Sequence, residues 1–293
     1  QGFPQRILTV ETLMHLGNWQ LDSVSGGTFR MDGGVMFGVV PKPLWRDVIE
    51  PDERNRVLCA NRCVLARDGR HTVLIDTGYG GKYSRLDRKF YDMQAGDPLL
   101  CSLEELGVAP DDVDTVVFSH LHFDHVGGAT QLDETRELRL TFTAARHVAG
   151  RQEWQDATSR EPELQTAYPL DEILPLQDAI TLVDDGDQVV PGLSVRQTGG
   201  HTRGHLSLVF QSCGETAVFV GDICPSTAHL RRMWHLAYDT YPLQTRRYKP
   251  ALLGEAADHN WWLLWYHDPT AAASRIVRHP KREFVVAESR VRL

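Results

Sequence analysis

Short apolar runs separated by turn residues recur along the chain and predict many strands with a few helices between them. Residues 56–67 and 70–78 predict two strands around an Asp68-Gly69 turn, since Asp-Gly favours tight hairpins. Residues 98–113 predict a helix that Gly107 ends, and residues 113–119 predict a buried strand. We further expect strands at 138–145, 179–197, 206–220, 261–267 and 283–289, helices starting at 147 and over 243–260, and a surface excursion over about 158–176.

The elements alternate between strand and helix, and most strand connections look like hairpins. This pattern is typical of two mixed sheets with helices outside. The predicted fold class is therefore α+β, an αββα sandwich of two mixed β-sheets flanked by helices. We expect one domain over residues 1–293, because no low-complexity linker divides the chain.

Composition narrows the function. The formal net charge is −8 and no run of basic residues is present, which argues against a nucleic-acid substrate. The apolar runs are too short to cross a membrane.

Five cysteines follow no zinc-ribbon spacing, so we interpret them as small buried hydrophobes of a reducing cytoplasm. We expect no signal peptide and a cytoplasmic location. The expected partner is a small molecule, without nucleic acid or membrane, and a homodimer is compatible with the sequence.

Four metal-binding side chains stand close together directly after the predicted strand at 113–119. They are His120, His122, Asp124 and His125. A loop at the carboxyl end of a strand is a favoured position for a site, because the rigid sheet holds it in place. A solvated loop that happens to be rich in histidine is the alternative. The density of ligand-type residues favours a metal site, and it suggests two neighbouring metals.

Three more candidate ligands have the same context as His120. His201 follows a strand and two glycines, Asp222 follows an apolar strand and a glycine, and His267 ends the apolar run at 261–267. Each of these side chains is expected at a strand end, where it can meet the others.

This ordered set of seven residues resembles the metallo-β-lactamase fold superfamily, over a span from Val73 to Pro269. The resemblance implies that His120, His122 and His201 hold one metal and that Asp124, His125 and His267 hold the other, with Asp222 bridging. The implied cofactors are two divalent ions, Zn²⁺ first, with iron or manganese compatible.

The same resemblance implies further roles. Asp76, in the sequence Asp76-Thr77-Gly78, is expected to orient a ligand or a loop amide, and His205 is expected to be structural. A hydroxide between the metals would be the nucleophile, since zinc lowers the pKa of bound water towards about 7. Asp124 and His125 are the catalytic candidates, with Asp124 as a proton shuttle.

Within the superfamily the chain looks most similar to the acyl-homoserine-lactone lactonase and organophosphate-hydrolase group. Residues 32–45 resemble the long opening loop of that group, but Pro225 stands where its lactonases commonly have a tyrosine donor. Met36, Phe37, His229 and Tyr238 are the candidate pocket residues. The predicted substrate has an ester-like bond, a lactone or aryl ester first, with promiscuous phosphotriester cleavage.

Other functions fit the same fold. A mononuclear iron dioxygenase of the persulfide type would use one metal for redox chemistry. A thioesterase similar to glyoxalase II would use both metals on another substrate. A nuclease is disfavoured by the acidic balance, and a non-catalytic binding module is disfavoured because all seven ligand positions are filled. Metal analysis separates the iron enzyme from the hydrolases.

Overall fold

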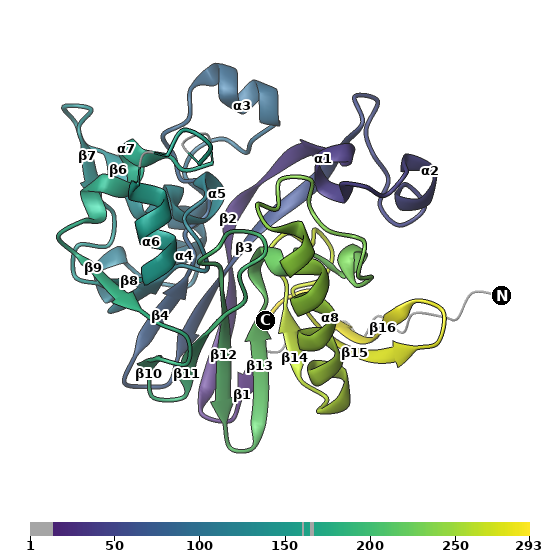
Figure 1. Cartoon of the computed structure of the whole chain (residues 1–293). Helices are drawn as coiled ribbons and strands as arrows, with labels where there is room; N and C mark the ends of the chain where they lie inside the picture. Colours follow the sequence, from purple (N-terminus) through teal and green to yellow (C-terminus); the bar gives the residue numbers. More distant parts are fainter. Residues whose placement is uncertain (1–13, 160, 165–166) are drawn as a thin grey trace.

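The computed structural model describes residues 14–159, 161–164 and 167–293, and within them two seven-stranded mixed sheets pack with helices alongside (Figure 1). The first sheet has the order β1–β2–β3–β4–β5–β8–β9, with the bounds β1 Met14–Leu16, β2 Trp19–Asp32, β3 Arg56–Arg67, β4 Thr72–Ile75, β5 Thr115–Val117, β8 Arg146–Gly150 and β9 Ile180–Val183. The second runs β10–β11–β12–β13–β14–β15–β16, with the bounds β10 Gln188–Val190, β11 Leu193–Gln197, β12 Leu206–Ser212, β13 Glu215–Phe219, β14 Trp262–Leu264, β15 Ala273–His279 and β16 Glu283–Arg290. A small hairpin joins β6 Thr130–Leu132 to β7 Leu138–Leu140.

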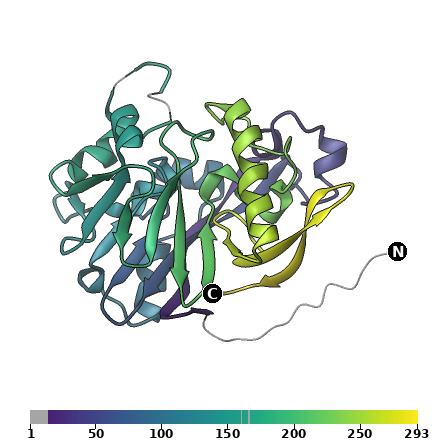
Figure 2. The same cartoon turned by 60° about the horizontal axis from the view of Figure 1, so that its bottom comes forward.

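The helices are mostly short, and the longest lies across the second sheet. Figure 2 shows this helix, α8, beside β15 and β16. Helices α1, α2 and α3 lie at the same end of the sheets as α5 (Figure 1). The helix bounds are α1 Gly33–Phe37, α2 Lys42–Trp45, α3 Arg85–Tyr91, α4 Pro98–Glu105, α5 Phe123–Val126, α6 Arg151–Thr158, α7 Leu170–Ile173 and α8 Pro242–Asp258, with single 3₁₀ turns at Pro110–Asp112, Gly127–Ala129, Leu174–Leu176, Gly221–Ile223 and Thr227–His229. The predicted α+β class with two mixed sheets is confirmed.

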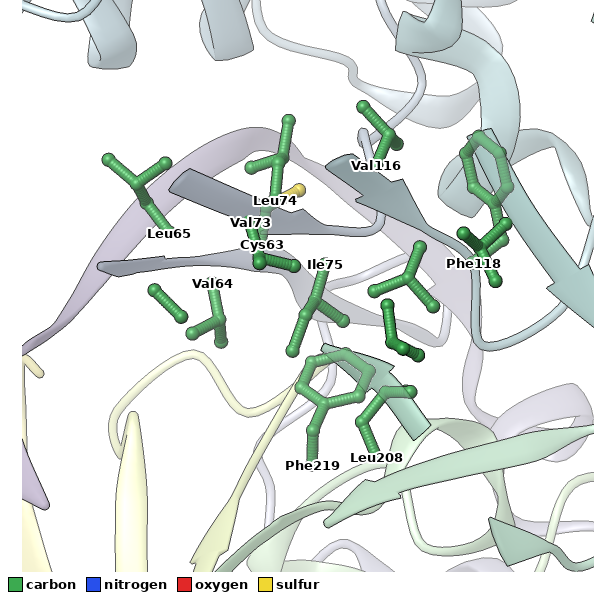
Figure 3. Close-up of a cluster of buried hydrophobic side chains, with 14 of the residues drawn as sticks. Cys63, Val64, Leu65, Val73, Leu74, Ile75, Val116, Phe118, Leu208 and Phe219 are labelled. Carbon is green, nitrogen blue, oxygen red and sulfur yellow. The ribbon is translucent and has the colours of Figure 1, made fainter. Parts of the chain in front are cut away.

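The two sheets share a core of aliphatic and aromatic side chains. Val64 and Ile75 of the first sheet point toward Leu208 and Phe219 of the second (Figure 3). All four are almost completely buried. Burying one large apolar side chain contributes about 1.5–3 kcal/mol, so this interface holds the sheets together.

The predicted Asp68-Gly69 hairpin turn is confirmed, and a second hairpin turn divides residues 206–220 into β12 and β13. In the β3–β4 turn, the Asp68 carboxylate accepts hydrogen bonds from the amides of Arg70 and His71, at 2.8 and 2.7 Å. Cys213 and Gly214 both have positive φ, of 51° and 83°, between β12 and β13. Two consecutive residues with positive φ match the twist of the flanking strands.

The strand predictions were incomplete. Strands β1, β2, β6 and β15 were not predicted. Residues 147–150, expected to begin a helix, belong to β8, and only Leu138–Leu140 of the strand expected at 138–145 forms one. The reason is clear for β2, whose Gly26-Gly27 pair looks like a turn but forms a bulge between Ser25 and Thr28. A Cβ on Gly26 would lie 2.7 Å from the Gly78 Cα, so the glycines let this strand approach the loop that carries Asp76.

The opening segment and two cysteines also differ from expectation. Residues 32–45 are partly helical, and the Asp32 side chain caps α1 by accepting from the amides of Gly34 and Val35. Cys59 and Cys63 are buried in β3 as predicted, and all five cysteines are free. Cys101 and Cys213 are exposed instead of buried. Among the described residues, no helix combines the length and apolar character needed to cross a membrane.

Candidate metal centre

The seven predicted ligands converge from the ends of four strands. His120 and His122 lie in the turn between β5 and α5, whereas Asp124 and His125 belong to α5 itself, a short helix that the sequence analysis treated as loop. His201 follows β11, Asp222 follows β13 and His267 follows β14. All seven side chains are buried. The common position after strands therefore does bring distant parts of the chain together.

Three ring nitrogens form a tight triangle. The Nε2 atom of His120 lies 3.1 Å from Nδ1 of His122, and Nε2 of His201 lies 3.2 and 3.0 Å from these two atoms. Three imidazole nitrogens at this spacing could share one divalent ion, for which a Zn–N bond is roughly 2.0–2.1 Å. The three residues form the first cluster.

A second cluster contains Asp124, His125 and His267. The Nε2 atom of His267 is 3.4 Å from an Asp124 carboxylate oxygen, and Nε2 of His125 is 3.9 Å from the other oxygen. Two imidazoles and a carboxylate are a ligand set that suits zinc, and also iron or manganese.

Asp222 lies between the two clusters. Its Oδ2 atom is 3.5 Å from Nε2 of His201, while its Oδ1 atom is 3.2 Å from Nε2 of His267 and 3.6 Å from Nε2 of His125. One carboxylate oxygen thus faces each cluster, as a bridging ligand requires.

Buried atoms without partners test whether a metal fits. The Nε2 atom of His125 and the Oδ1 atom of Asp222 are buried and make no hydrogen bond to the described residues. Buried polar atoms are normally satisfied, so an unpaired imidazole nitrogen beside an unpaired carboxylate oxygen calls for a cation. The residues of both clusters therefore fit a divalent metal.

The electrostatics of the clusters reflect their burial. Burial raises the pKa of the Asp124 carboxyl to about 6. Burial also opposes ionisation of Asp222, but His267, His125 and His201 outweigh it and hold the pKa of Asp222 well below its usual range. Burial lowers the pKa of His120 and His122 well below the usual value, which keeps these rings neutral and able to bind a metal.

Asp76 and His205 lie just behind the ligands. Asp76 accepts from both the amide and the hydroxyl of Ser119 at 2.7 Å, and its Oδ2 atom is 2.8 Å from Nδ1 of His125. His205 accepts from the Asp222 amide at 3.0 Å through Nε2, and its Nδ1 is 2.7 Å from the Thr198 hydroxyl. Asp76 therefore directs Nε2 of His125 toward the clusters, and His205 fixes the backbone at Asp222.

Two buried acids near the site were missed by the sequence analysis. Glu153 of α6 accepts from the amide of Leu121 and from the hydroxyl of Thr202, so it joins the loops that carry His120 and His201. Asp239 contacts Nδ1 of His201 at 2.9 Å. Neither acid has a sequence signal, because one lies on an ordinary helix face and the other in an irregular segment.

The four candidate pocket residues lie in different environments. Phe37 is fully buried and stacks between Trp45 and His229, with ring centroids 5.1 and 4.7 Å apart. His229 is also buried, with Nε2 2.9 Å from the Met36 carbonyl oxygen and Nδ1 2.8 Å from the Ser226 hydroxyl. Both nitrogens of His229 are engaged, so this ring and Phe37 support the wall of the site from behind.

Tyr238 and Met36 lie closer to the clusters. The half-buried Tyr238 ring has its centroid 5.4 Å from that of His201, and its hydroxyl is 3.9 Å from the Met36 sulfur. Pro225 accepts a 2.9 Å hydrogen bond from the His267 amide through its carbonyl, so it holds the backbone of a candidate ligand. Cys224 is buried, and burial raises the pKa of its thiol to about 12, which disfavours the thiolate that binds metal.

The fold and the paired clusters define a metal-binding protein of the αββα class. It belongs to the Metallo-beta-lactamase superfamily, which matches over residues 56–267. A curated relative, the N-acyl homoserine lactonase of Bacillus thuringiensis, is 32% identical over 160 residues, which cover 51% of this chain. The match spans 58% of that lactonase, so the chain aligns with less than two thirds of its length.

Solved structures extend the comparison to nearly the whole chain. A probable metal-dependent hydrolase from Staphylococcus aureus is 30% identical with a TM-score of 0.87, over 95% of this chain and 98% of that one. AidC, a dizinc quorum-quenching lactonase, has a TM-score of 0.76 at 19% identity, over 94% and 96% of the two chains. At 19% identity, the similarity to AidC concerns the fold alone.

Proposed function

We propose that this protein is a hydrolase that uses two divalent metal ions, zinc first, to cleave an ester-like bond. The observation that carries the proposal is Asp222, whose two carboxylate oxygens face separate clusters. His120, His122 and His201 would hold one ion, and Asp124, His125 and His267 would hold the other.

Buried charge supports two metals over one. Asp76, Asp124, Asp222 and Asp239 are all buried in or directly behind the clusters. An uncompensated buried carboxylate is costly, so buried charges are normally paired or bound to metal. Glu153 is buried behind the first cluster as well, so two divalent cations would offset more of this negative charge than one cation would.

The residues of the chain divide the catalytic work. When bound, the metal ions would supply a hydroxide at neutral pH and polarise the oxygen of the attacked group. Asp124, whose carboxylate oxygens lie near Nε2 of His125 and Nε2 of His267, would act as the proton shuttle that takes the proton of the nucleophile and passes it to the leaving group. Asp76 would keep the His125 ring in one tautomer and one orientation.

The substrate proposal is a lactone or aryl ester, with phosphotriesters as a weaker promiscuous activity. Support comes from the relatives named N-acyl homoserine lactonase, and from an apolar wall beside the second cluster. In that wall the half-buried Phe123 packs on the buried Phe29 at 5.9 Å between ring centroids, and Phe29 lies behind His267 at the same spacing. Pockets that are mostly apolar, with few polar anchors, suit a substrate with an apolar arm.

The test is metal analysis followed by kcat/KM for a panel of lactones, aryl esters, thioesters, phosphotriesters and β-lactams. We expect two zinc equivalents per chain, and lactone or aryl ester turnover above the other classes. A single iron equivalent with oxygen consumption on persulfides would replace this proposal with the dioxygenase. If only thioesters are cleaved, the proposed metal centre stands and the proposed substrate class changes to thioesters.

Tyr238 is the proposed hydrogen-bond donor to the substrate, and Tyr238→Phe should lower kcat. Among the described residues its hydroxyl contacts only the Met36 thioether, a weak acceptor, so its proton is available. Burial and the nearby carboxylates raise its pKa well above the usual value, so the phenol stays protonated. Losing one such donor can cost about 10²–10³ in kcat.

Tyr241→Phe is the matched control, because Tyr241 is 37% exposed and bonds to the site through its backbone amide. We expect it to leave kcat unchanged, and both variants to keep full metal content. Equal kcat for the wild type and Tyr238→Phe would remove Tyr238 from the reaction.

A further inference from the structure

Asp239 forms a buried contact with a candidate metal ligand. Its Oδ1 atom lies 2.9 Å from Nδ1 of His201, and both side chains are fully buried. A carboxylate at Nδ1 holds the ring proton there and leaves Nε2 free. This free Nε2 is the atom that closes the triangle with His120 and His122.

The contact continues away from the clusters through two more residues. The other oxygen of Asp239 lies 3.3 Å from Nδ1 of His235. Arg246 of α8 donates from Nε to Nε2 of His235 at 2.9 Å. Because Arg246 can only donate, Nε2 of His235 accepts and its proton must be on Nδ1, where the Leu236 carbonyl oxygen lies at 2.9 Å and the Asp239 oxygen at 3.3 Å. His235 therefore packs against Asp239, while the hydrogen bond of the Asp239 carboxylate goes to His201.

The backbone fixes the same segment against the His201 loop. The amide of Thr240 donates to the His201 carbonyl oxygen, and that of Tyr241 donates to the Gly200 carbonyl oxygen, both at 2.8 Å. Gly200 has a φ of +87°, and a Cβ there would lie 2.7 Å from the Thr245 hydroxyl oxygen at the start of α8. Asp239 and α8 are thus held in place relative to His201.

The other histidines are supported differently. His125 of the second cluster faces the Asp76 carboxylate at 2.8 Å. Nδ1 of His267 lies 2.9 Å from the Ala60 carbonyl oxygen, and that of His120 lies 3.1 Å from the Ser119 hydroxyl. Each cluster therefore has one histidine backed by a carboxylate.

We propose that Asp239, held beside His201 by the pairing of Thr240 and Tyr241 with the His201 loop, is a positioning residue for the first cluster, and that Asp239 and Asp76 set the affinities of the two metal sites separately. The inference rests on the proposed metal centre and is independent of the substrate. It gives a role to the segment before α8, which lies outside the motif of seven ligands.

The test measures metal binding directly. Zn²⁺ affinity is determined by chelator competition, and Co²⁺ titrations are followed by visible absorption, for the wild type, Asp239→Ala, Asp239→Asn and Asp76→Ala. We expect Asp239→Ala to weaken one equivalent by about 10–100-fold and to leave the other within about threefold, as loss of such partners typically does. Asp239→Asn retains an acceptor for His201 and should lose less than Asp239→Ala. Asp76→Ala should weaken the other equivalent and change a different part of the Co²⁺ spectrum.

Site-blocked backgrounds assign the effect to a cluster. In a His267→Ala background, which lacks the second site, Asp239→Ala should still weaken the remaining equivalent. In a His122→Ala background, which lacks the first site, Asp239→Ala should have no effect on the remaining one. An equal loss at both sites, or no loss, would overturn the proposal.

Fold integrity and the metal count are checked separately. Far-UV circular dichroism of the metal-free forms shows whether Asp239→Ala still folds. If it does not fold, metal binding is compared with Asp239→Asn, whose side chain has the same shape as aspartate. A wild type that binds one equivalent would refute the two-metal function. The positioning role would then be tested on the single bound metal. His122→Ala should abolish its binding and Asp239→Ala should weaken it. Any other pair of results would refute the role.

Discussion

Replacing Asp222 with alanine is expected to remove tight binding of both metal ions and to lower kcat/KM by at least about 10³-fold. Asp222 is the residue whose two oxygens face both clusters, at 3.5 Å from His201 and 3.2 Å from His267. Its loss takes one ligand oxygen from each site and the single negative charge that the two sites share. A water without its metals returns from a pKa of about 7 towards 15.7, so hydroxide at neutral pH is lost.

The measurement is metal content after dialysis, with kcat/KM on the best substrate of the panel. Cys224→Ala is the matched control, since Cys224 is buried two residues away and its sulfur faces the carbonyl oxygens of Ser226 and His229. The control should keep both metals. Two tightly bound ions in the Asp222→Ala protein would show that the carboxylate does not bridge.

The candidate ligands were accessible from the sequence because their context is local. Each follows an apolar strand, and strands that end at one edge of a sheet bring their following residues together. His201 follows β11 and Asp222 follows β13, and both strands pair antiparallel with β12 between them, so the two loops leave the second sheet at the same edge.

The residues that support the ligands were harder to predict. Asp239 meets His201 through the pairing of Thr240 and Tyr241 with the His201 loop, which no local pattern encodes. The bulge in β2 hid a strand behind a Gly-Gly pair that usually marks a turn. Apolar patterning also cannot separate a pocket wall from the layer behind it, which is why Phe37 looked like a lining residue and is fully buried.

The second large effect is expected for His267→Ala, which should remove one metal equivalent and keep the other. His267 belongs to the second cluster, and the triangle of His120, His122 and His201 does not include it. The Ala60 and Pro225 carbonyl oxygens fix the His267 ring and backbone at 2.9 Å each, so Nε2 of His267 is held facing the second cluster. We expect kcat to fall by at least about 10²-fold, because one of the two charges that stabilise the transition state is lost.

His229→Gln is the matched control for this experiment. His229 is equally buried, but its nitrogens bond to Ser226 and to the Met36 carbonyl oxygen, and glutamine can keep a donor to the latter. This variant should keep two equivalents and most of kcat. Metal content and kcat are measured together, because the one-metal dioxygenase and the two-metal hydrolase predict different pairs of values. Full metal content with an unchanged rate in His267→Ala would take His267 out of the site, and a one-metal centre on His120, His122 and His201 would then be the simpler interpretation.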